Sequence, residues 1–329
     1  MPTTIKKTRK LLFHSSNHEC QESQGGEAEL HKHLENCSKN PGHVQSIPVE
    51  EFAWKHLPKG HRGQALYDLI KTTADLTVRV AVGNTSLKRP DVWAETLSLY
   101  PFSDKRGQKK FRTGSGMIWY VDKFTDGTKQ DGGKHWKKYK KCWCRNCQYS
   151  ESPNNVWWDF KVYTATHVVF DEMEASHTYL RLFYDKNDSP EVIVDRVSVD
   201  YTHVEHDRCL LNCVTCDETV GQRLEVTWRR YRETWPKVRR IYRESKHGDR
   251  LTFIVSHPHG CSKQISVGQW KNKYQMGNRF KYKFTYTTCT CPGSSGAYVH
   301  CVGYNRWATQ LDHSGTSTEG NFSGAGFIM

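Results

Sequence analysis

The chain has 329 residues and carries 48 Lys and Arg against 35 Asp and Glu, which gives a formal charge of +13 and a pI near 9.1. This length can bury one large core or two ordinary ones. No stretch approaches the roughly 18 apolar residues of a membrane helix. Only Leu11, Leu12 and Phe13 follow the basic start, too few for a signal peptide. We therefore expect a non-secreted protein, cytoplasmic or nuclear, with no membrane partner.

The first 50 residues are polar and poor in aromatic side chains, which predicts an N-terminal tail that need not fold. The chain has 12 cysteines, and without an export signal they indicate thiols or metal ligands rather than disulfides. The tail holds residue types that zinc accepts, at spacings that fit no standard zinc finger: His18, Cys20, His31, His33 and Cys37.

Residues 51–74 are expected to be a helical linker, because Leu66, Leu69 and Ile70 have helical spacing. Beyond it, short β-branched and aromatic runs separated by turn residues are typical of a barrel or a sandwich. We expect these strands near residues 76–82, 116–121, 156–165, 179–184, 192–199, 251–256, 263–268, 280–288, 297–304 and 325–328.

A basic connecting segment, about residues 217–249, divides the strand-rich region 75–329 into a first part, about 75–215, and a second part, about 250–329. Within this segment, the apolar spacing of 223–244 predicts a helix that stops at Pro236.

Residues 134–147, KHWKKYKKCWCRNC, interrupt the strand pattern as an exposed insertion. Lys134–Lys141, interleaved with aromatic rings, could bind a nucleic-acid backbone, or could form a solvated loop. Cys142, Cys144 and Cys147 would supply three ligands of a structural zinc ion, with the fourth from elsewhere in the chain, such as Cys37 or a histidine. Three free thiols are the alternative.

Residues 289–300, CTCPGSSGAYVH, place two serines between glycines. A serine becomes a nucleophile only when a base takes its proton and a third group orients that base. His167 stands at the end of an expected strand, and Asp207 opens an aliphatic one. Asp195 and Asp200 compete with Asp207 as the orienting carboxylate.

Four motifs occur in the order TATHVV, HDRCLL, SHPHG with QISVG, and PGSSGAYV, and together they resemble the trypsin-like serine peptidases. The resemblance implies an all-β chain of two β-barrels of chymotrypsin type. It also implies a triad of His167, Asp207 and Ser295, with the N–H groups of Gly293 and Ser295 as the oxyanion hole. Ser294 stands where relatives carry Asp. The G-x-S-x-G elbow of α/β-hydrolases does not fit this segment.

The same resemblance bears on specificity. Cys289 stands where tryptic members carry Asp, so cleavage after Lys or Arg is not expected. DHSGTSTEGNFSGAGFI resembles the last strands of glutamyl endopeptidases, which places His313 in the P1 pocket with Ser314, Gly315 and Cys289. This implies a preference for Glu or Gln, although a histidine that only packs in the strand is the alternative. No Ile-Val-Gly-Gly sequence occurs, so activation is expected to differ, with the N-terminal tail as one route.

We therefore expect a serine-type endopeptidase, a hydrolase that needs no cofactor and acts on protein or peptide substrates. The alternative is a non-catalytic protein of the same fold that binds peptide or nucleic acid. A third hypothesis is a zinc-dependent nucleic-acid-binding protein, which predicts steeply salt-dependent binding.

Overall fold

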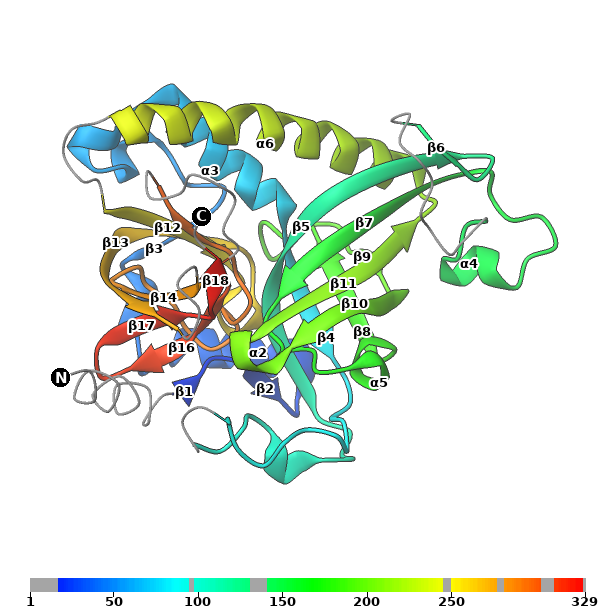
Figure 1. The fold of residues 1–329 in the computed structure, drawn as a ribbon, viewed down its shortest axis with the longest axis horizontal. Coiled ribbons are helices and arrows are strands. Elements are labelled where there is room, and N and C mark those ends of the chain that lie inside the picture. The colour runs from blue at the N-terminus through cyan, green and yellow to red at the C-terminus, as the bar shows by residue number, and fades with distance from the viewer. Residues whose placement is uncertain are drawn as a thin grey trace.

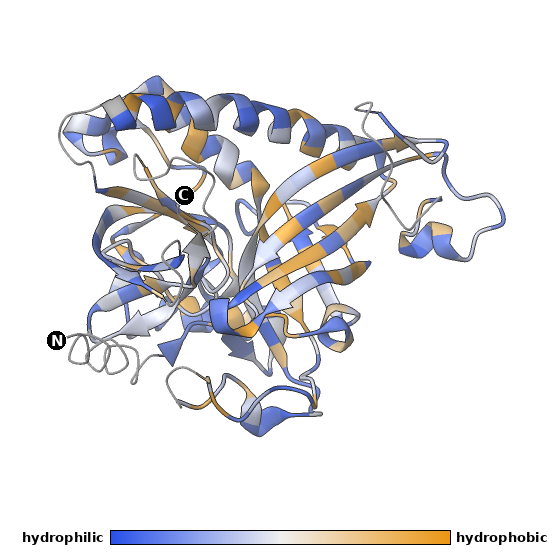
Figure 2. Cartoon of the chain, in the orientation of Figure 1, coloured by the Kyte–Doolittle hydropathy of each residue, from blue (hydrophilic) through white to orange (hydrophobic). Residues whose placement is uncertain are grey.

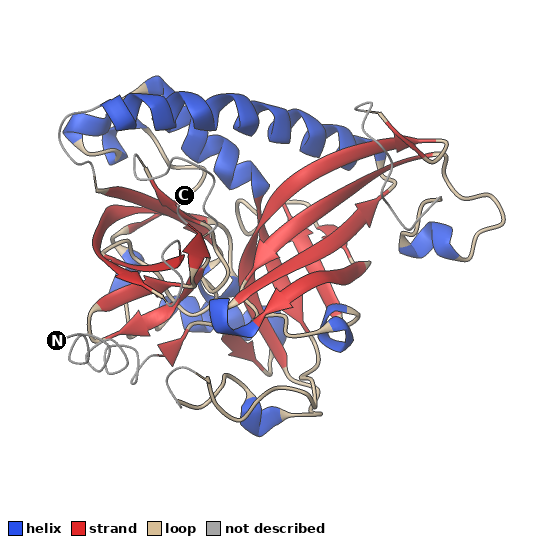
Figure 3. Ribbon diagram, in the orientation of Figure 1, coloured by secondary structure: helices blue, strands red, loops and turns tan. Residues whose placement is uncertain are grey.

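The structure is a computed structural model that describes residues 17–94, 98–130, 141–244, 250–276, 281–302 and 311–327. Its strands form two antiparallel sheets of nine strands each, accompanied by several helices (Figures 1 and 3). No helix within these ranges is long and apolar enough to span a membrane. Each strand expected from the sequence overlaps a strand of one of the two sheets.

The first sheet has the order β10-β11-β7-β5-β4-β8-β9, and β2 and β6 also pair with β5. Alternation along its strands builds the core, since Val78, Val80 and Val82 of β4 all join one buried cluster. Its strands are β2 (Gln21–Ser23), β4 (Thr77–Val82), β5 (Phe111–Thr125), β6 (Thr128–Lys129), β7 (Val156–Thr164), β8 (Thr178–Leu182), β9 (Val192–Val194), β10 (Val197–His203) and β11 (Arg208–Thr215).

The second sheet has the order β1-β16-β17-β14-β13-β12-β15, with β18 paired to β14 and β3 paired to β13. Its strands are β1 (Asn17–His18), β3 (Ser46–Pro48), β12 (Leu251–Ser256), β13 (Gln264–Gln275), β14 (Lys281–Tyr286), β15 (Val299–Cys301), β16 (His313–Ser317), β17 (Gly320–Ser323) and β18 (Gly326–Phe327). The strands after residue 250 therefore belong to one sheet, and those between 77 and 215 to the other.

Helix α6 (Glu218–Glu244) runs along one side of the molecule and packs against α3 (Gln64–Leu76) (Figure 1). The expectation that this helix stops at Pro236 is wrong. An interior proline removes one hydrogen bond and disfavours the helix, but Trp235 and Val238 on either side of it are buried in the core. Hydrophobic and hydrophilic residues alternate along α6, so one side packs inward while the other stays polar (Figure 2).

Residues 17–50, expected to belong to a polar tail that need not fold, contain secondary structure. This part of the chain contributes β1, β2, β3 and helix α2 (Gly26–Glu35). Its polar strands are ordered because they pair with strands of both sheets: β1 with β16, β2 with β5 and β3 with β13. Helix α2 is anchored by buried Leu30 and by an ion pair from Glu27 to the fully buried Arg79, 2.5 Å apart. Residues 1–16 of the expected tail lie outside the described ranges.

Candidate active site

The structure brings together three residues that the sequence predicted as a triad. His167 Nδ1 lies 2.8 Å from each carboxylate oxygen of Asp207, and His167 Nε2 lies 2.7 Å from Ser295 Oγ. All three side chains are buried. The register of β7 and β11 pairs Thr164 with Cys209. Because His167 follows this pair on one strand and Asp207 precedes it on the other, the base and the acid meet where the pairing ends.

The two competing carboxylates have other partners. Asp195, which is 42% exposed, binds Arg145 at 2.9 Å, and Asp200 binds Lys161 at 2.5 Å. Both ion pairs lie at the surface, where solvent weakens them. Asp207 is therefore the carboxylate that orients His167.

A buried ion-pair network holds the turn that carries His167. Glu174, in α5 (Glu172–Ala175), binds Arg89 Nε at 2.7 Å and Arg112 Nη2 at 2.6 Å. Arg89 donates a hydrogen bond to the carbonyl of His167 at 3.1 Å, and Arg112 donates one to the carbonyl of Val168 at 3.0 Å. These residues carry no sequence motif, and the sequence analysis did not select them.

The charges in the triad stabilise each other. Burial alone would lower the pKa of His167, but the Asp207 carboxylate and the neighbouring Cys20 thiol raise it to about 9. Burial likewise disfavours the Asp207 anion, yet His167 and the hydroxyl of Ser314 hold the pKa of Asp207 well below its ordinary value. Ser314 Oγ donates to Asp207 Oδ2 at 2.5 Å. The pair therefore favours a charged imidazole, the form that appears once His167 has taken a proton.

The loop before β15 presents two backbone N–H groups beside the serine. Gly293 has φ +95°, and a Cβ there would lie 2.5 Å from the carbonyl oxygen of His257, so only glycine fits. The N–H groups of Gly293 and Ser295 both point at one carbonyl oxygen, that of Glu19, at 2.7 and 3.3 Å. Ser294 lies 3.0 Å from Ser256 through its Oγ and supports the loop from within.

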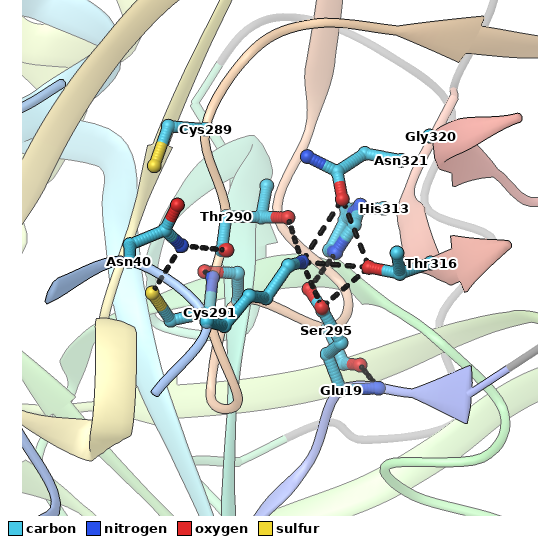
Figure 4. Close-up of polar contacts among 12 residues, drawn as sticks. Glu19, Asn40, Cys289, Thr290, Cys291, Ser295, His313, Thr316, Gly320 and Asn321 are labelled. Carbon is cyan, nitrogen blue, oxygen red and sulfur yellow. Dashed lines mark hydrogen bonds and ion pairs between the residues drawn. The ribbon is translucent and has the colours of Figure 1, made fainter. Parts of the chain in front are cut away.

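A pocket beside this loop holds the side chain of Glu19 (Figure 4). His313 Nε2 lies 2.7 Å from Glu19 Oε2, and Thr316 donates to Oε1 at 2.6 Å. Lys39 forms an ion pair with the same Oε1. Burial opposes ionisation, but the hydrogen bond from His313 and the charge of Lys39 hold the pKa of Glu19 well below its ordinary value. These contacts therefore hold the side chain of Glu19 as a carboxylate.

The partners of His313 define its role. Its Nδ1 lies 2.6 Å from the hydroxyl of Tyr286, and burial lowers its pKa, so the ring is neutral. With Tyr286 donating to Nδ1, the proton of His313 lies on Nε2 and is donated to Glu19. Lys39 is held in place by Thr290 at 3.2 Å and Asn321 at 2.9 Å. The sequence analysis missed Lys39, which lies 277 residues from Thr316 in the chain.

The other residues predicted for the P1 pocket have different surroundings. Ser314 binds Asp207, as described above, and its carbonyl oxygen lies 3.1 Å from His18 Nδ1. Gly315 pairs with His18 across β16 and β1, and a Cβ there would lie 2.2 Å from the carbonyl oxygen of Asn17. The Cys289 thiol contacts Ser46 Oγ at 3.6 Å and lies apart from Glu19 in Figure 4.

The predicted cysteine cluster lies near the short helix α4 (Arg145–Gln148) (Figure 1). Its member Cys216 follows the end of β11 opposite to Asp207. The structure adds Cys216 to Cys142, Cys144 and Cys147, and their sulfur atoms all lie within 4.8 Å of one another. The sequence left the fourth ligand open and suggested Cys37 or a histidine; the structure instead brings Cys216, which follows β11, beside Cys144 and Cys147. Cys216 Sγ lies 3.4 Å from Cys144 Sγ and 3.8 Å from Cys147 Sγ, separations that suit a tetrahedral zinc ion.

The predicted nucleic-acid contact at Lys134–Lys141 lies outside the described residues, except for Lys141. A second basic surface is the outer side of α6. It exposes Arg229, Arg230, Arg232, Lys237, Arg240 and Arg243.

No protein-family model matches the chain, and no curated protein sequence matches it. Among solved structures, the HtrA-type protease AlgW with decapeptide matches 80% of this chain at 12% identity with a TM-score of 0.38. The match covers 63% of AlgW, so the chain spans less than two thirds of that protein. The structure of Deg5 matches 81% of this chain and 90% of its own at 10% identity, also with a TM-score of 0.38. At these values the likeness carries no argument about activity, which has to come from the site itself.

Proposed function

We propose that this protein is a serine endopeptidase of the chymotrypsin type that cleaves peptide bonds after glutamate. The observation that carries the proposal is the buried chain of contacts from Asp207 through His167 to Ser295 Oγ, with two N–H groups converging beside that oxygen. The nucleophile, base, orienting acid and oxyanion donors of acyl transfer are then all present within one site.

The geometry supports the following reaction. Ser295 Oγ attacks the carbonyl carbon of the substrate while His167 Nε2 takes the hydroxyl proton. Asp207 stabilises the resulting imidazolium, and the N–H groups of Gly293 and Ser295 bind the oxyanion. His167 then donates its proton to the leaving amine, which breaks the peptide bond and leaves an ester on Ser295. Water, deprotonated by His167, hydrolyses this ester and restores the serine.

Glutamate is preferred over glutamine because its carboxylate meets the positive charge of Lys39 and a donor at each oxygen. Lys39 and Thr316 both bind one carboxylate oxygen, and His313 donates to the other. A glutamine amide would turn its own N–H₂ group toward one of these donors. Charge-assisted hydrogen bonds contribute about 1.5–3 kcal/mol each, so the discrimination is about 10- to 100-fold in kcat/KM.

A structural zinc ion at Cys142, Cys144, Cys147 and Cys216 is part of this proposal. The site fits zinc because the four buried or half-buried thiols converge, and because the backbone N–H of Asn154 donates to Cys147 Sγ at 3.4 Å, as a partner of a thiolate would. Such a closed four-sulfur site supplies stability to the fold and takes no part in peptide hydrolysis.

A fluorophosphonate probe tests the activity. The full chain should be labelled on Ser295 and should hydrolyse peptides with Glu at P1, whereas the Ser295→Ala variant should do neither. Ser294→Ala is the matched control, because this serine faces into the loop. If Ser295 is labelled neither in folded wild type nor in Glu19→Ala, and neither protein cuts peptide, the alternative of a non-catalytic binding protein is favoured. Hydrolysis mainly after Leu, Phe or Arg would contradict the assigned specificity alone.

A further inference from the structure

Residues 17–23 of the chain lie across the candidate active site as an extended peptide. Strand β1 pairs with β16 of the second sheet, with His18 opposite Gly315, and β2 pairs with β5 of the first sheet, with Gln21 opposite Thr113. The bond between Glu19 and Cys20 therefore lies between the two sheets. Adding a strand to an exposed sheet edge is a general way to bind extended peptides.

The contacts of Glu19 are those that the P1 residue of a bound substrate would make in the proposed reaction. Its carbonyl oxygen accepts the hydrogen bonds of Gly293 and Ser295, and its side chain fills the carboxylate pocket. Its backbone N–H, whose nitrogen is two bonds from the carbonyl carbon, donates a hydrogen bond to Ser295 Oγ at 3.1 Å, so the nucleophile lies beside this residue.

The residues on both sides of Glu19 are seated as well. The ring of His18 lies between His167 and Trp93, with ring centres 4.6 and 4.9 Å apart. Burial lowers the pKa of His18 to about 3, so its ring stays neutral beside His167. On the other side, Gln21 Oε1 lies 2.8 Å from His259 Nδ1.

From this arrangement we infer that the chain cleaves itself between Glu19 and Cys20, an inference that rests on the proposed function. Ser295 Oγ attacks the Glu19 carbonyl carbon and its proton passes to His167. The bond to the Cys20 nitrogen breaks, and that nitrogen receives the proton from His167. Water then hydrolyses the Glu19–Ser295 ester, which leaves a carboxylate on Glu19, an amine on Cys20 and the free serine.

The uncut segment also blocks the site. A substrate with glutamate at P1 needs the pocket, the oxyanion donors and the edge of β16, all of which residues 17–19 occupy. Lys39 follows the cleavage point, so it stays with the pocket after the bond is cut. The cleavage therefore opens a complete site for other substrates.

The test follows the full chain by intact mass and N-terminal sequencing. Wild type should yield a fragment that begins at Cys20, at a rate independent of protein concentration. Ser295→Ala and Glu19→Ala should stay intact, whereas Glu22→Ala, which changes the next acidic residue, should be cut like wild type. Cleavage of Ser295→Ala by added active enzyme, at a rate that rises with concentration, together with no first-order cleavage of wild type, would overturn self-cleavage within one chain.

Glu19→Ala separates this inference from the proposed function, because the variant empties the pocket without a cleavable glutamate. If it hydrolyses added glutamate peptides while wild type stays whole at Glu19, self-cleavage is wrong and the proposed function stands. If it neither reacts with fluorophosphonate nor hydrolyses peptide, and wild type also stays whole at Glu19, both are wrong.

A second cluster of metal-ligand side chains lies beside the nucleophile loop. Cys37, His43, His259 and Cys291 each place one ligand atom within 4.8 Å of the others. Cys37 Sγ lies 3.7 Å from Cys291 Sγ, and Cys291 Sγ lies 3.7 Å from His43 Nδ1. Around a tetrahedral zinc ion with bonds of about 2.0–2.3 Å, such ligand atoms stand about 3.5–3.8 Å apart.

The remaining hydrogen bonds leave one nitrogen of each histidine for a metal. His43 Nε2 lies 3.1 Å from the carbonyl oxygen of Leu34, which leaves Nδ1 for the ion. His259 Nδ1 binds Gln21, and its buried Nε2 has no hydrogen-bond partner in the part of the chain that the structure describes. Asn40 donates to Cys291 Sγ at 2.9 Å through its side chain and to Cys37 Sγ at 3.4 Å through its backbone.

We propose that Cys37, His43, His259 and Cys291 bind a zinc ion that ties the segment after α2 to the nucleophile loop. Cys291 lies two residues before Gly293, and its N–H donates to Ser294 Oγ at 3.2 Å. The ion would therefore hold Lys39 at the pocket and the loop in its oxyanion-binding shape. This site is independent of self-cleavage, since all four ligands follow Cys20.

Metal analysis of the purified full chain tests this site. We expect about two zinc ions per chain in wild type and about one in Cys37→Ser and in Cys216→Ser, since each cluster holds one ion. His33→Asn, a nearby histidine outside the cluster, should keep the wild-type content. Cobalt loaded into Cys216→Ser should show the visible absorption of a tetrahedral Cys₂His₂ site. Unchanged zinc content in Cys37→Ser would overturn the proposal.

Discussion

The two sheets contribute different halves of the candidate site, and the halves differ in how solvent reaches them. The first sheet supplies His167 and Asp207, both buried and held by the network around Glu174. The second sheet supplies Ser295 and the carboxylate pocket, but the pocket is completed by Lys39, whose side chain is 29% exposed. The proposed chemistry thus depends on side chains sealed from water, whereas the proposed specificity depends partly on one that water reaches.

The largest effect is expected in the first half. Asp207→Asn removes the charge that orients His167 and stabilises its imidazolium, so kcat for a glutamate peptide should fall on the order of 10⁴-fold. Asp195→Asn, an exposed carboxylate elsewhere in the same sheet, is the control and should retain wild-type activity. A similar rate for both variants would show that the buried pair does not drive the reaction.

A smaller effect is expected in the pocket. Lys39→Met should lower kcat/KM for a glutamate peptide by about 10- to 100-fold, because one charge-assisted contact is lost. The ratio of glutamate to glutamine hydrolysis should fall with it. Lys32→Met, on the exposed side of α2, serves as the control. A loss as large as that of Asp207→Asn would contradict the separation of chemistry from specificity.

The pH dependence of kcat/KM should reflect the titration of His167, which belongs to the first half of the site. His167 acts as a base only when neutral, and its pKa is raised to about 9, so kcat/KM should rise as the pH increases through the alkaline range. A substrate glutamate is already ionised at a pH well below this range, so its titration does not contribute to the rise of kcat/KM. In Asp207→Asn the residual activity should reach its plateau at lower pH. A wild-type profile that has already reached its plateau by about pH 8, as an ordinary histidine pKa of about 6.5 would give, would contradict the raised value.

The smallest effect on hydrolysis is expected at the four-cysteine cluster. Cys216→Ser should lower the zinc content while glutamate-peptide hydrolysis stays close to wild type, because the cluster lies away from both halves of the site. Cys213→Ala, a buried cysteine of β11 outside the cluster, should keep its zinc. Equal zinc content in the two variants would contradict the proposed zinc site at the four cysteines.

Much of the first half was predictable because its residues occur in short local motifs. TATHVV and HDRCLL each place a polar residue at the end of a buried strand, and two such ends can meet only if the strands pair. Residues 17–50 were not predictable in this way. Their order comes from hydrogen bonds to sheet edges more than 60 residues away, which composition does not encode. Lys39 was missed for the same reason: it reaches Glu19, Thr290, Thr316 and Asn321 only through the tertiary structure.

The sequence by itself determined the short strands, which follow from local spacing. Its resemblance to the trypsin-like peptidases predicted the order of the triad residues and the choice of Ser295 over Ser294. Only the tertiary structure decided which carboxylate meets His167, which residue joins Cys142, Cys144 and Cys147, and what fills the pocket. Each of these depends on side chains brought together from distant parts of the chain. Their contact is set by strand register and burial, which no local pattern contains.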